Sequence, residues 1–157
     1  MLIGAGGAAR GVLPSLLEEA PKSIVVANRT IEKAKKIVEE FGSEAYQTSK
    51  SSNLIASGLS FENMKDFEFD IVINATSIST DPSQNLNLDE SIFRNTSLAL
   101  DLYYSQAFTP FMDLADRAKV PIIIDGWGML VEQAAESFFL WTGFRPDTSK
   151  LIEGHGE

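Results

Sequence analysis

Short apolar runs alternate along this chain with segments in which apolar residues recur at helical spacing. The runs predict strands, because consecutive apolar residues between polar ones are typical of strands buried on both faces of a parallel sheet. They cover residues 1–3, 23–28, 70–74, 98–102 and 121–125, and a weaker one covers residues 44–46. Helical spacing is found in residues 8–20, 31–41, 89–93, 110–118 and 127–141. The polar residues 77–87 predict a loop, and residues 48–60 predict a loop or a weak helix.

Strands that alternate with helices predict an α/β fold. We expect three layers, in which helices cover both faces of a doubly wound parallel Rossmann sheet of about six strands. The 157 residues suffice for one domain, and we expect residues 1–157 to form it. Only residues 1–3 precede the first glycine, whereas a strand typically has about five or six residues. We therefore expect the chain to begin inside its own first strand and to be part of a longer protein.

A glycine cluster follows the first apolar run and opens the first helical segment. Gly4 permits a tight turn, Gly6 lets a phosphate approach the backbone, and Ala9 permits close packing of the helix on the strand. A glycine turn before a helix can also be only a turn. The strand and helix around this one favour a dinucleotide site, with the diphosphate at the amino end of the helix.

The end of the second apolar run indicates which dinucleotide is bound. NAD-binding sheets usually carry an acidic residue there, which accepts hydrogen bonds from the ribose hydroxyl groups. This chain has Asn28-Arg29-Thr30 instead, and an arginine can bind the 2′-phosphate of NADP through charge-assisted hydrogen bonds. We therefore expect NADP as the cofactor, with Lys33 either adding a second charge or lying on a solvated helix face.

Composition and charge argue against several other classes of protein. There is no cysteine, which excludes disulfides and thiolate metal sites, and the one histidine, His155, falls in the tail, where a solvated side chain is the simpler interpretation. The net charge of −9 argues against binding to nucleic acid or to an anionic membrane surface. No apolar run approaches the roughly 20 residues of a membrane span, so we expect a cytoplasmic protein.

The helix expected over residues 127–141 is apolar over most of its circumference. A helix that packs on one sheet needs only an apolar stripe. We therefore expect a second surface to cover this helix, either another domain or a second copy of the chain in a homodimer. A helix buried deep in the core of this chain is the alternative. The apolar residues are Met129, Leu130, Val131, Ala134, Ala135, Phe138, Phe139, Leu140 and Trp141.

Several motifs together resemble the NADP-binding half of the shikimate dehydrogenase family. They are Gly4-Ala5-Gly6-Gly7-Ala8-Ala9-Arg10-Gly11, Asn28-Arg29-Thr30, Ile73-Asn74-Ala75-Thr76-Ser77, Thr109-Pro110-Phe111, residues 125–135 and Leu140-Trp141-Thr142-Gly143. The resemblance implies an enzyme that reduces 3-dehydroshikimate to shikimate with NADPH, in the pathway to aromatic amino acids. It also implies two domains around a cleft, of which this chain lacks the N-terminal one with the catalytic Lys–Asp pair.

The resemblance further implies a role for individual residues. Residues around the diphosphate would be Gly4, Gly6, Gly7, Ala8 and Ala9, and those around the adenosine 2′-phosphate would be Asn28, Arg29, Thr30 and Lys33. Residues along the cofactor would be Asn74, Ala75, Thr76 and Ser77, followed by Leu102 and Gly126 at the nicotinamide. Tyr104 and Gln133 match positions that reach the substrate; an ordinary buried tyrosine and an exposed helix residue are the alternatives. The helices of residues 127–153 would pack toward the missing substrate domain.

The chemistry of hydride transfer requires a titratable group that handles a proton on the substrate oxygen. The strand ends that face the expected cleft offer Asp101, Tyr104, Asp125 and Gln133, with no lysine or histidine. The two acids are more simply caps of turns, so we expect no catalytic residue in this chain and little or no activity of the chain alone. The leading interpretation is the NADP-binding half of a shikimate dehydrogenase. A quinate/shikimate dehydrogenase fragment and a non-catalytic, stand-alone NADP-binding module are the alternatives.

Overall fold

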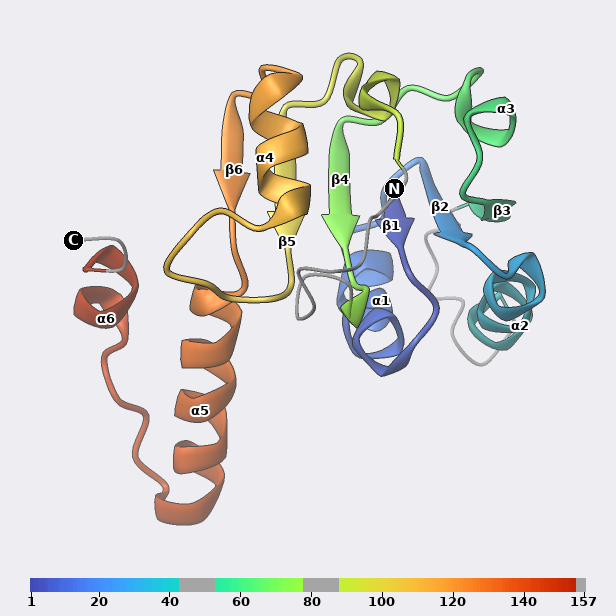
Figure 1. Ribbon diagram of the computed structural model, residues 1–157. Helices are drawn as coiled ribbons and strands as arrows, with labels where there is room; N and C mark the ends of the chain where they lie inside the picture. The colour runs from blue at the N-terminus through green and yellow to red at the C-terminus, as the bar shows by residue number, and fades with distance from the viewer. Residues whose placement is uncertain (43–52, 78–87, 155–157) are drawn as a thin grey trace.

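The computed structural model describes residues 1–42, 53–77 and 88–154 of the chain. Within these residues six parallel strands form one sheet (Figure 1). The strands are β1 (Leu2–Ile3), β2 (Ser23–Asn28), β3 (Asn53–Gly58), β4 (Ile71–Asn74), β5 (Leu98–Asp101) and β6 (Ile122–Ile124). Their order across the sheet, β3-β2-β1-β4-β5-β6, is that of a doubly wound dinucleotide-binding fold. The predicted fold class is confirmed.

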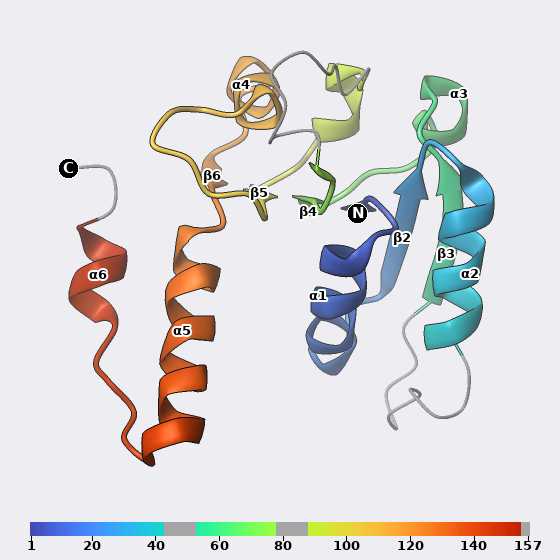
Figure 2. The same cartoon turned by 60° about the horizontal axis from the view of Figure 1, so that its bottom comes forward.

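Helices lie on both sides of this sheet. Figure 2 shows α3 and α4 on one side and α1, α2 and α5 on the other, which gives the three layers expected from the sequence. The helices are α1 (Gly7–Glu18), α2 (Ile31–Phe41), α3 (Phe61–Met64), η2 (Glu90–Phe93), α4 (Pro110–Arg117), α5 (Trp127–Thr142) and α6 (Ser149–Glu153), where η2 is a 3₁₀-helix.

Strands β1 and β2 are buried on both faces, because their side chains alternate between two helical layers. Leu2 and Val26 belong to an apolar cluster with side chains of α1 and α2, whereas Ile3 and Val25 belong to a second cluster with side chains of α4. β1 is central although it has only two residues, since Leu2 pairs with β2 on one side and with β4 on the other. The carboxyl ends of β2 and β4 therefore flank the turn that follows β1.

The loop or weak helix predicted over residues 48–60 is wrong for the part that the structure describes. Asn53–Gly58 forms β3, whose six residues pair in parallel with all of β2. β3 lies at the edge of the sheet and is only half-buried, so its short apolar run, Leu54-Ile55-Ala56, is flanked by Asn and Ser and is easily missed in the sequence. The strand predicted over residues 44–46, and most of the loop predicted over residues 77–87, lie outside the described residues.

Candidate functional site

The turn between β1 and α1 contains glycines for two different reasons. Gly4 has a φ of +110°, which residues with a side chain rarely adopt, and a Cβ there would lie 2.8 Å from the carbonyl oxygen of Ala75. A Cβ at Gly6, by contrast, would meet nothing within 4 Å. Gly4 is therefore required by the packing of the chain itself, whereas the space beside Gly6 is open to a ligand.

The amino end of α1 suits an anion. Its N-cap is Gly6, which has no side chain to accept a hydrogen bond, and its first turn contains no acidic residue. The first amides of a helix lack acceptors within the helix, and the helix dipole gives this end a partial positive charge. A phosphate group satisfies both conditions.

A cavity of about 430 Å³ lies in front of this turn. It is located where β1 separates β2 from β4, which is the point where the strand order reverses and where open α/β sheets bind their ligands. Its lining brings together three predicted segments: the glycine turn, the end of β2 and the residues after β4. The lining residues are Gly4, Ala5, Gly6, Gly7, Ala8, Asn28, Arg29, Leu59, Ala75, Thr76 and Ser77.

Leu59 and Ala5 line this cavity but are not among the residues predicted from the sequence. Leu59 directly follows β3, so its place at the cavity depends on a strand that the sequence does not predict. The apolar run before Gly58 is the signal that could have located it, because the end of any parallel strand lies at the same edge of the sheet. Ala5 lies between two predicted glycines, and its position in the turn was the available signal.

Arg29 brings a guanidinium group to the wall of the cavity. The Asn28 side-chain amide donates a hydrogen bond to the Thr30 carbonyl (2.9 Å) and so holds the turn from β2 to α2. Arg29 is exposed, and no carboxylate of the described residues pairs with it. Thr30, which is the N-cap of α2, and Lys33 are also exposed, but they do not line the cavity.

Two predicted cofactor residues lie behind the cavity wall. Ala9 is fully buried in the cluster beneath α1, as expected of a small residue that lets the helix approach the strand. Asn74 is fully buried as well, and its Oδ1 accepts hydrogen bonds from the Thr76 amide (3.1 Å) and the Thr76 hydroxyl (2.7 Å). Asn74 therefore shapes the cavity through Thr76.

Leu102 and Gly126 lie farther along the same edge of the sheet and do not line the cavity. A Cβ on Gly126 would lie 2.1 Å from the Leu102 carbonyl oxygen, so the glycine lets the ends of β5 and β6 approach closely. The Leu102 amide donates to the Asn74 carbonyl (2.9 Å), and the Gly126 amide donates to the Tyr103 carbonyl (3.2 Å). Backbone hydrogen bonds thus connect the ends of β4, β5 and β6.

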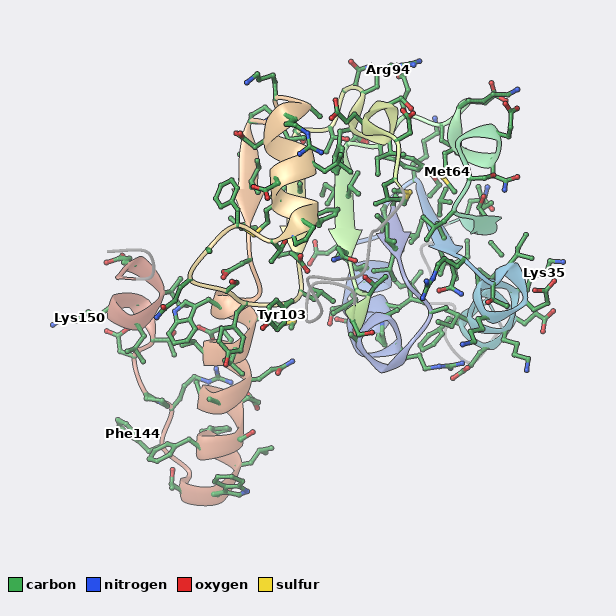
Figure 3. The ribbon with its side chains drawn as sticks, in the orientation of Figure 1. Lys35, Met64, Arg94, Tyr103, Phe144 and Lys150 are labelled. Carbon is green, nitrogen blue, oxygen red and sulfur yellow. The ribbon has the colours of Figure 1, made fainter. Side chains whose placement is uncertain are left out.

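The two residues predicted to reach the substrate lie beyond β5 and on α5. Tyr104 is half exposed, which makes the alternative of an ordinary buried tyrosine wrong. Its ring centroid lies 5.9 Å from that of Tyr103, which Figure 3 shows at the carboxyl end of β5, and 6.0 Å from that of Trp127. Gln133 lies exposed on α5, which agrees with either interpretation of it.

The acids at the strand ends hold backbone amides. Asp125 accepts hydrogen bonds from the amides of Ser105 (3.0 Å) and Trp127 (3.1 Å), and Asp101 accepts one from the amide of Tyr103 (3.1 Å). Among the described residues no group of acidic or histidine side chains could hold a metal ion. Over the same residues, no helix is long and apolar enough to cross a membrane.

The sequence of this chain matches two models of protein families. The model described as shikimate / quinate 5-dehydrogenase matches residues 1–102, and the model described as the shikimate 5′-dehydrogenase C-terminal domain matches residues 126–153. The chain belongs to the shikimate dehydrogenase family. The resemblance predicted from the glycine turn and the later motifs is thereby confirmed.

Individual relatives extend beyond this chain. The NADP(+) shikimate dehydrogenase of Nitrosospira multiformis is 45% identical over 152 residues, which are 97% of this chain and 52% of that protein. The chain thus spans about half the length of the curated shikimate dehydrogenases that it matches.

Solved structures show the same partial coverage. The structure of an Ael1 enzyme of Pseudomonas putida matches with a TM-score of 0.80 at 37% sequence identity. The match covers 99% of this chain and 54% of the Ael1 chain. The shikimate 5-dehydrogenase of Thermus thermophilus, in complex with NADP(H) and shikimate, has a TM-score of 0.72 at 32% identity over 97% of this chain and 52% of that one. The fold described above is therefore shared with about half of each of these enzymes.

Proposed function

We propose that this chain is the NADP(H)-binding half of an enzyme that interconverts 3-dehydroshikimate and shikimate. The observation that supports this most directly is the single cavity in which the glycine turn, Arg29 and residues 75–77 meet. The names of the curated relatives support the reaction and the cofactor, and a similar structure holds both NADP(H) and shikimate.

The cofactor would lie across the carboxyl edge of the sheet. Its diphosphate would accept hydrogen bonds from the open amides at the amino end of α1, beside Gly6 and Gly7. Its 2′-phosphate would pair with Arg29, since the end of β2 carries no acid that would repel it. The rest of the cofactor would follow residues 75–77 toward Leu102 and Gly126.

Calorimetric titration with NADP⁺, and with NAD⁺ as the comparison, tests this proposal. We expect a preference for NADP⁺, and we expect Arg29→Ala to weaken NADP⁺ binding roughly 10- to 100-fold, because a hydrogen bond to a charged group is lost. Binding of NAD⁺ should be nearly unchanged. Arg94→Ala is the matched control, because Arg94 is an exposed arginine outside the cavity. Equal losses for both cofactors would assign Arg29 a structural role, and the absence of binding would refute the cofactor site.

The chain alone would have little or no activity. When bound, the nicotinamide supplies the hydride chemistry, and a separate group must exchange a proton with the substrate oxygen. Over the described residues, the ends of β4, β5 and β6 present no lysine or histidine, and Asp101 and Asp125 already hold backbone amides. Clear turnover of shikimate with NADP⁺ by the isolated chain would contradict this part of the proposal.

The substrate would reach this chain beside Tyr104, whose exposed ring lies next to Trp127, and Gln133 on α5 would approach it from the same side. Quinate is the second candidate substrate, because the matching family model covers both shikimate and quinate enzymes. Mixing the chain with the remaining half of a relative separates the alternatives. Oxidation of shikimate, or of quinate, identifies the substrate, whereas NADP⁺ binding without turnover of either favours a stand-alone module.

Helices α5 and α6 would pack against the other half of the enzyme. Their exposed apolar side chains include Phe138, Leu140 and Trp141, and Figure 3 shows Phe144 at the end of α5 that is remote from the sheet. This exposure argues against the alternative of a helix buried deep in the core of this chain. A homodimer through α5 is the competing occupant of this surface. Light scattering distinguishes the two, because a chain that stays monomeric at high concentration excludes the homodimer.

A further inference from the structure

A buried hydrogen-bond network joins the ends of β4 and β5. Its centre is the carboxylate of Asp101, which is fully buried, as is Asn74. Oδ1 of Asp101 accepts hydrogen bonds from the Asn74 side-chain amide (3.0 Å) and from the backbone amide of Tyr103 (3.1 Å). Oδ2 accepts one from the Thr109 hydroxyl (2.6 Å).

This arrangement fixes which way the Asn74 amide points. A side-chain amide has a donor end and an acceptor end, and its two orientations differ only in the partners that they satisfy. Because the carboxylate of Asp101 accepts at Oδ1, the NH₂ group of Asn74 must face it, and the carbonyl oxygen must face away. That oxygen is the one that accepts from the amide and hydroxyl of Thr76, which lines the cavity.

We propose that Asp101 is a positioning residue. Its carboxylate fixes the position of Thr76 in the wall of the cavity and, at the same time, the position of the turn at Tyr103. This inference rests on the proposed function, since Thr76 matters only if the cavity holds NADP(H). Asp101 touches neither cofactor nor substrate; it acts through Asn74 on one side and through the Tyr103 amide on the other. Tyr104, which follows Tyr103, is the residue expected at the substrate. A displaced Asp101 carboxylate would therefore disturb the binding of the cofactor, through Thr76, and of the substrate, through Tyr104.

The substitution Asp101→Asn separates positioning from general stability. It keeps the shape of the side chain but puts an NH₂ group where one carboxylate oxygen accepted. If this group faces Asn74, two NH₂ groups oppose each other; if it faces Thr109, the Thr109 hydroxyl proton loses its acceptor at Asp101. We expect NADP⁺ binding to weaken roughly tenfold at a temperature where the variant is fully folded.

The matched control is Thr96→Val, which removes another buried hydroxyl bond near the opposite end of β5, from Thr96 to the Phe69 carbonyl (2.8 Å). This control should lower the melting temperature and leave the dissociation constant of NADP⁺ unchanged. The second readout is amide hydrogen exchange by NMR. Exchange at Thr76 and Tyr103 should accelerate in Asp101→Asn and not in the control.

A second pair of variants keeps the test decisive if Asp101→Asn does not fold. Thr109→Val removes the donor to Oδ2 of Asp101, whereas Thr109→Ser retains a hydroxyl group and should behave as the unmodified chain does. We expect Thr109→Val to weaken NADP⁺ binding about threefold. A dissociation constant that stays unchanged in a folded Asp101 or Thr109 variant, while the melting temperature falls as in the control, would overturn the positioning role. If the unmodified chain does not bind NADP⁺ at all, the proposed function fails, and hydrogen exchange still decides whether Asp101 aligns the two segments.

Discussion

The two halves of the sheet differ in how completely the chain covers them. On the side of α1 and α2, Leu2 and Val26 of the first half are fully buried. On the same face of the second half, Ile71 is 46% exposed, Ile122 is 51% exposed and Ile124 is 44% exposed. These three residues share a face because the parallel register sets Ile71 beside Leu98, and Leu98 beside Ile122. On this side, the first half of the sheet is therefore fully covered by helices, whereas the second half exposes apolar side chains to solvent.

The second half is not poorly folded, since its opposite face is well covered. Val72 and Ala99 are fully buried in the cluster beneath α4. Helix α5 lies on the exposed side, but Figure 2 shows it standing apart from α1, and its Leu140 and Trp141 are 74% and 82% exposed. The two halves of the sheet therefore differ on one face only: that face is covered by helices α1 and α2 in the first half and is largely exposed in the second.

The sharpest test of this difference is a pair of leucine truncations. Leu13→Ala, in α1 above the covered half, should lower the free energy of unfolding by about 3–5 kcal/mol, because Leu13 is fully buried. Leu140→Ala, on α5, should lower it by less than about 0.5 kcal/mol, because that side chain is mostly in water already. Urea unfolding of both variants measures the two values. Similar losses would mean that α5 is part of the core of this chain.

The sequence predicted the elements whose local pattern matches their burial. The run Ile24-Val25-Val26-Ala27 is apolar throughout because it lies in a strand covered on both sides, and its prediction is confirmed. β3 was missed because an edge strand that is half-buried needs few apolar residues, so tertiary pairing with β2 decides its structure. The wide apolar surface of α5 was visible in the sequence, but the gap in coverage beside it is visible only in space.

The candidate site can be predicted from the sequence where a local motif alone indicates the role of a residue. The glycine turn and Arg29 follow from the spacing of the motif, and the structure places them at one cavity. The resemblance implies that Asn74 lies along the cofactor; in the structure its side chain is buried and accepts hydrogen bonds from Thr76, which lines the cavity. The network around Asp101 could not be predicted, because its partners come from residues 74, 103 and 109 and meet only when β4 and β5 pair in register.

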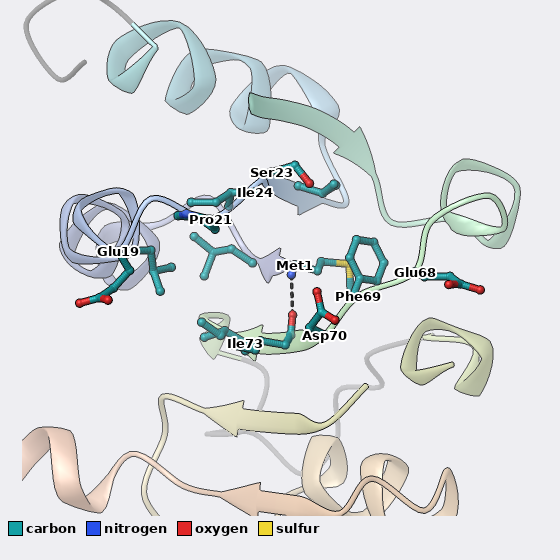
Figure 4. Close-up of a pocket in the computed structure, with 13 residues that line it drawn as sticks. Met1, Glu19, Pro21, Ser23, Ile24, Glu68, Phe69, Asp70 and Ile73 are labelled. Carbon is teal, nitrogen blue, oxygen red and sulfur yellow. Dashed lines mark hydrogen bonds between the residues drawn. The ribbon is translucent and has the colours of Figure 1, made fainter. Parts of the chain in front are cut away.

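The pH dependence of the free energy of unfolding tests the burial of the Met1 amino group, whose cavity is also lined by Ile71 of the exposed face. Figure 4 shows the amino group of Met1 in a cavity lined by residues of α1, β1, β2 and β4, where it donates a hydrogen bond to the Ile71 carbonyl (2.6 Å). Burial lowers the pKa of this group from 8.0 to about 5, and the nearby Asp70 carboxylate opposes the shift. Glu19 and Glu68 line the same cavity.

The sign of this effect follows from the lowered pKa. Between pH 8 and pH 5 the unfolded chain binds the proton more readily than the folded chain, so stability is full above pH 8 and falls as the pH drops toward 5. The loss should be on the order of 2–4 kcal/mol, at about 1.4 kcal/mol for each pKa unit. Urea unfolding of the chain with a free and with an acetylated amino terminus isolates this contribution. An identical pH dependence in the two forms would contradict the assignment.

The smallest effect is expected at the surface of the well-covered face, where α4 is joined to η2. Nε of Arg117 lies 3.0 Å from Oε1 of Glu90, and both side chains are more than half exposed. Water and salt screen such a pair, so Arg117→Ala should cost about 0.5 kcal/mol at low ionic strength and nothing measurable at about 1 M NaCl, where the Debye length is about 3 Å. Arg94→Ala is the control, because Arg94 is an exposed arginine beside the same η2 helix and pairs with no acid of the described residues. If the loss in free energy of unfolding for Arg117→Ala persists at high salt, the aliphatic part of the Arg117 side chain, rather than its charge, stabilises α4. The covered face of the second half would then depend on apolar packing even at its exposed edge.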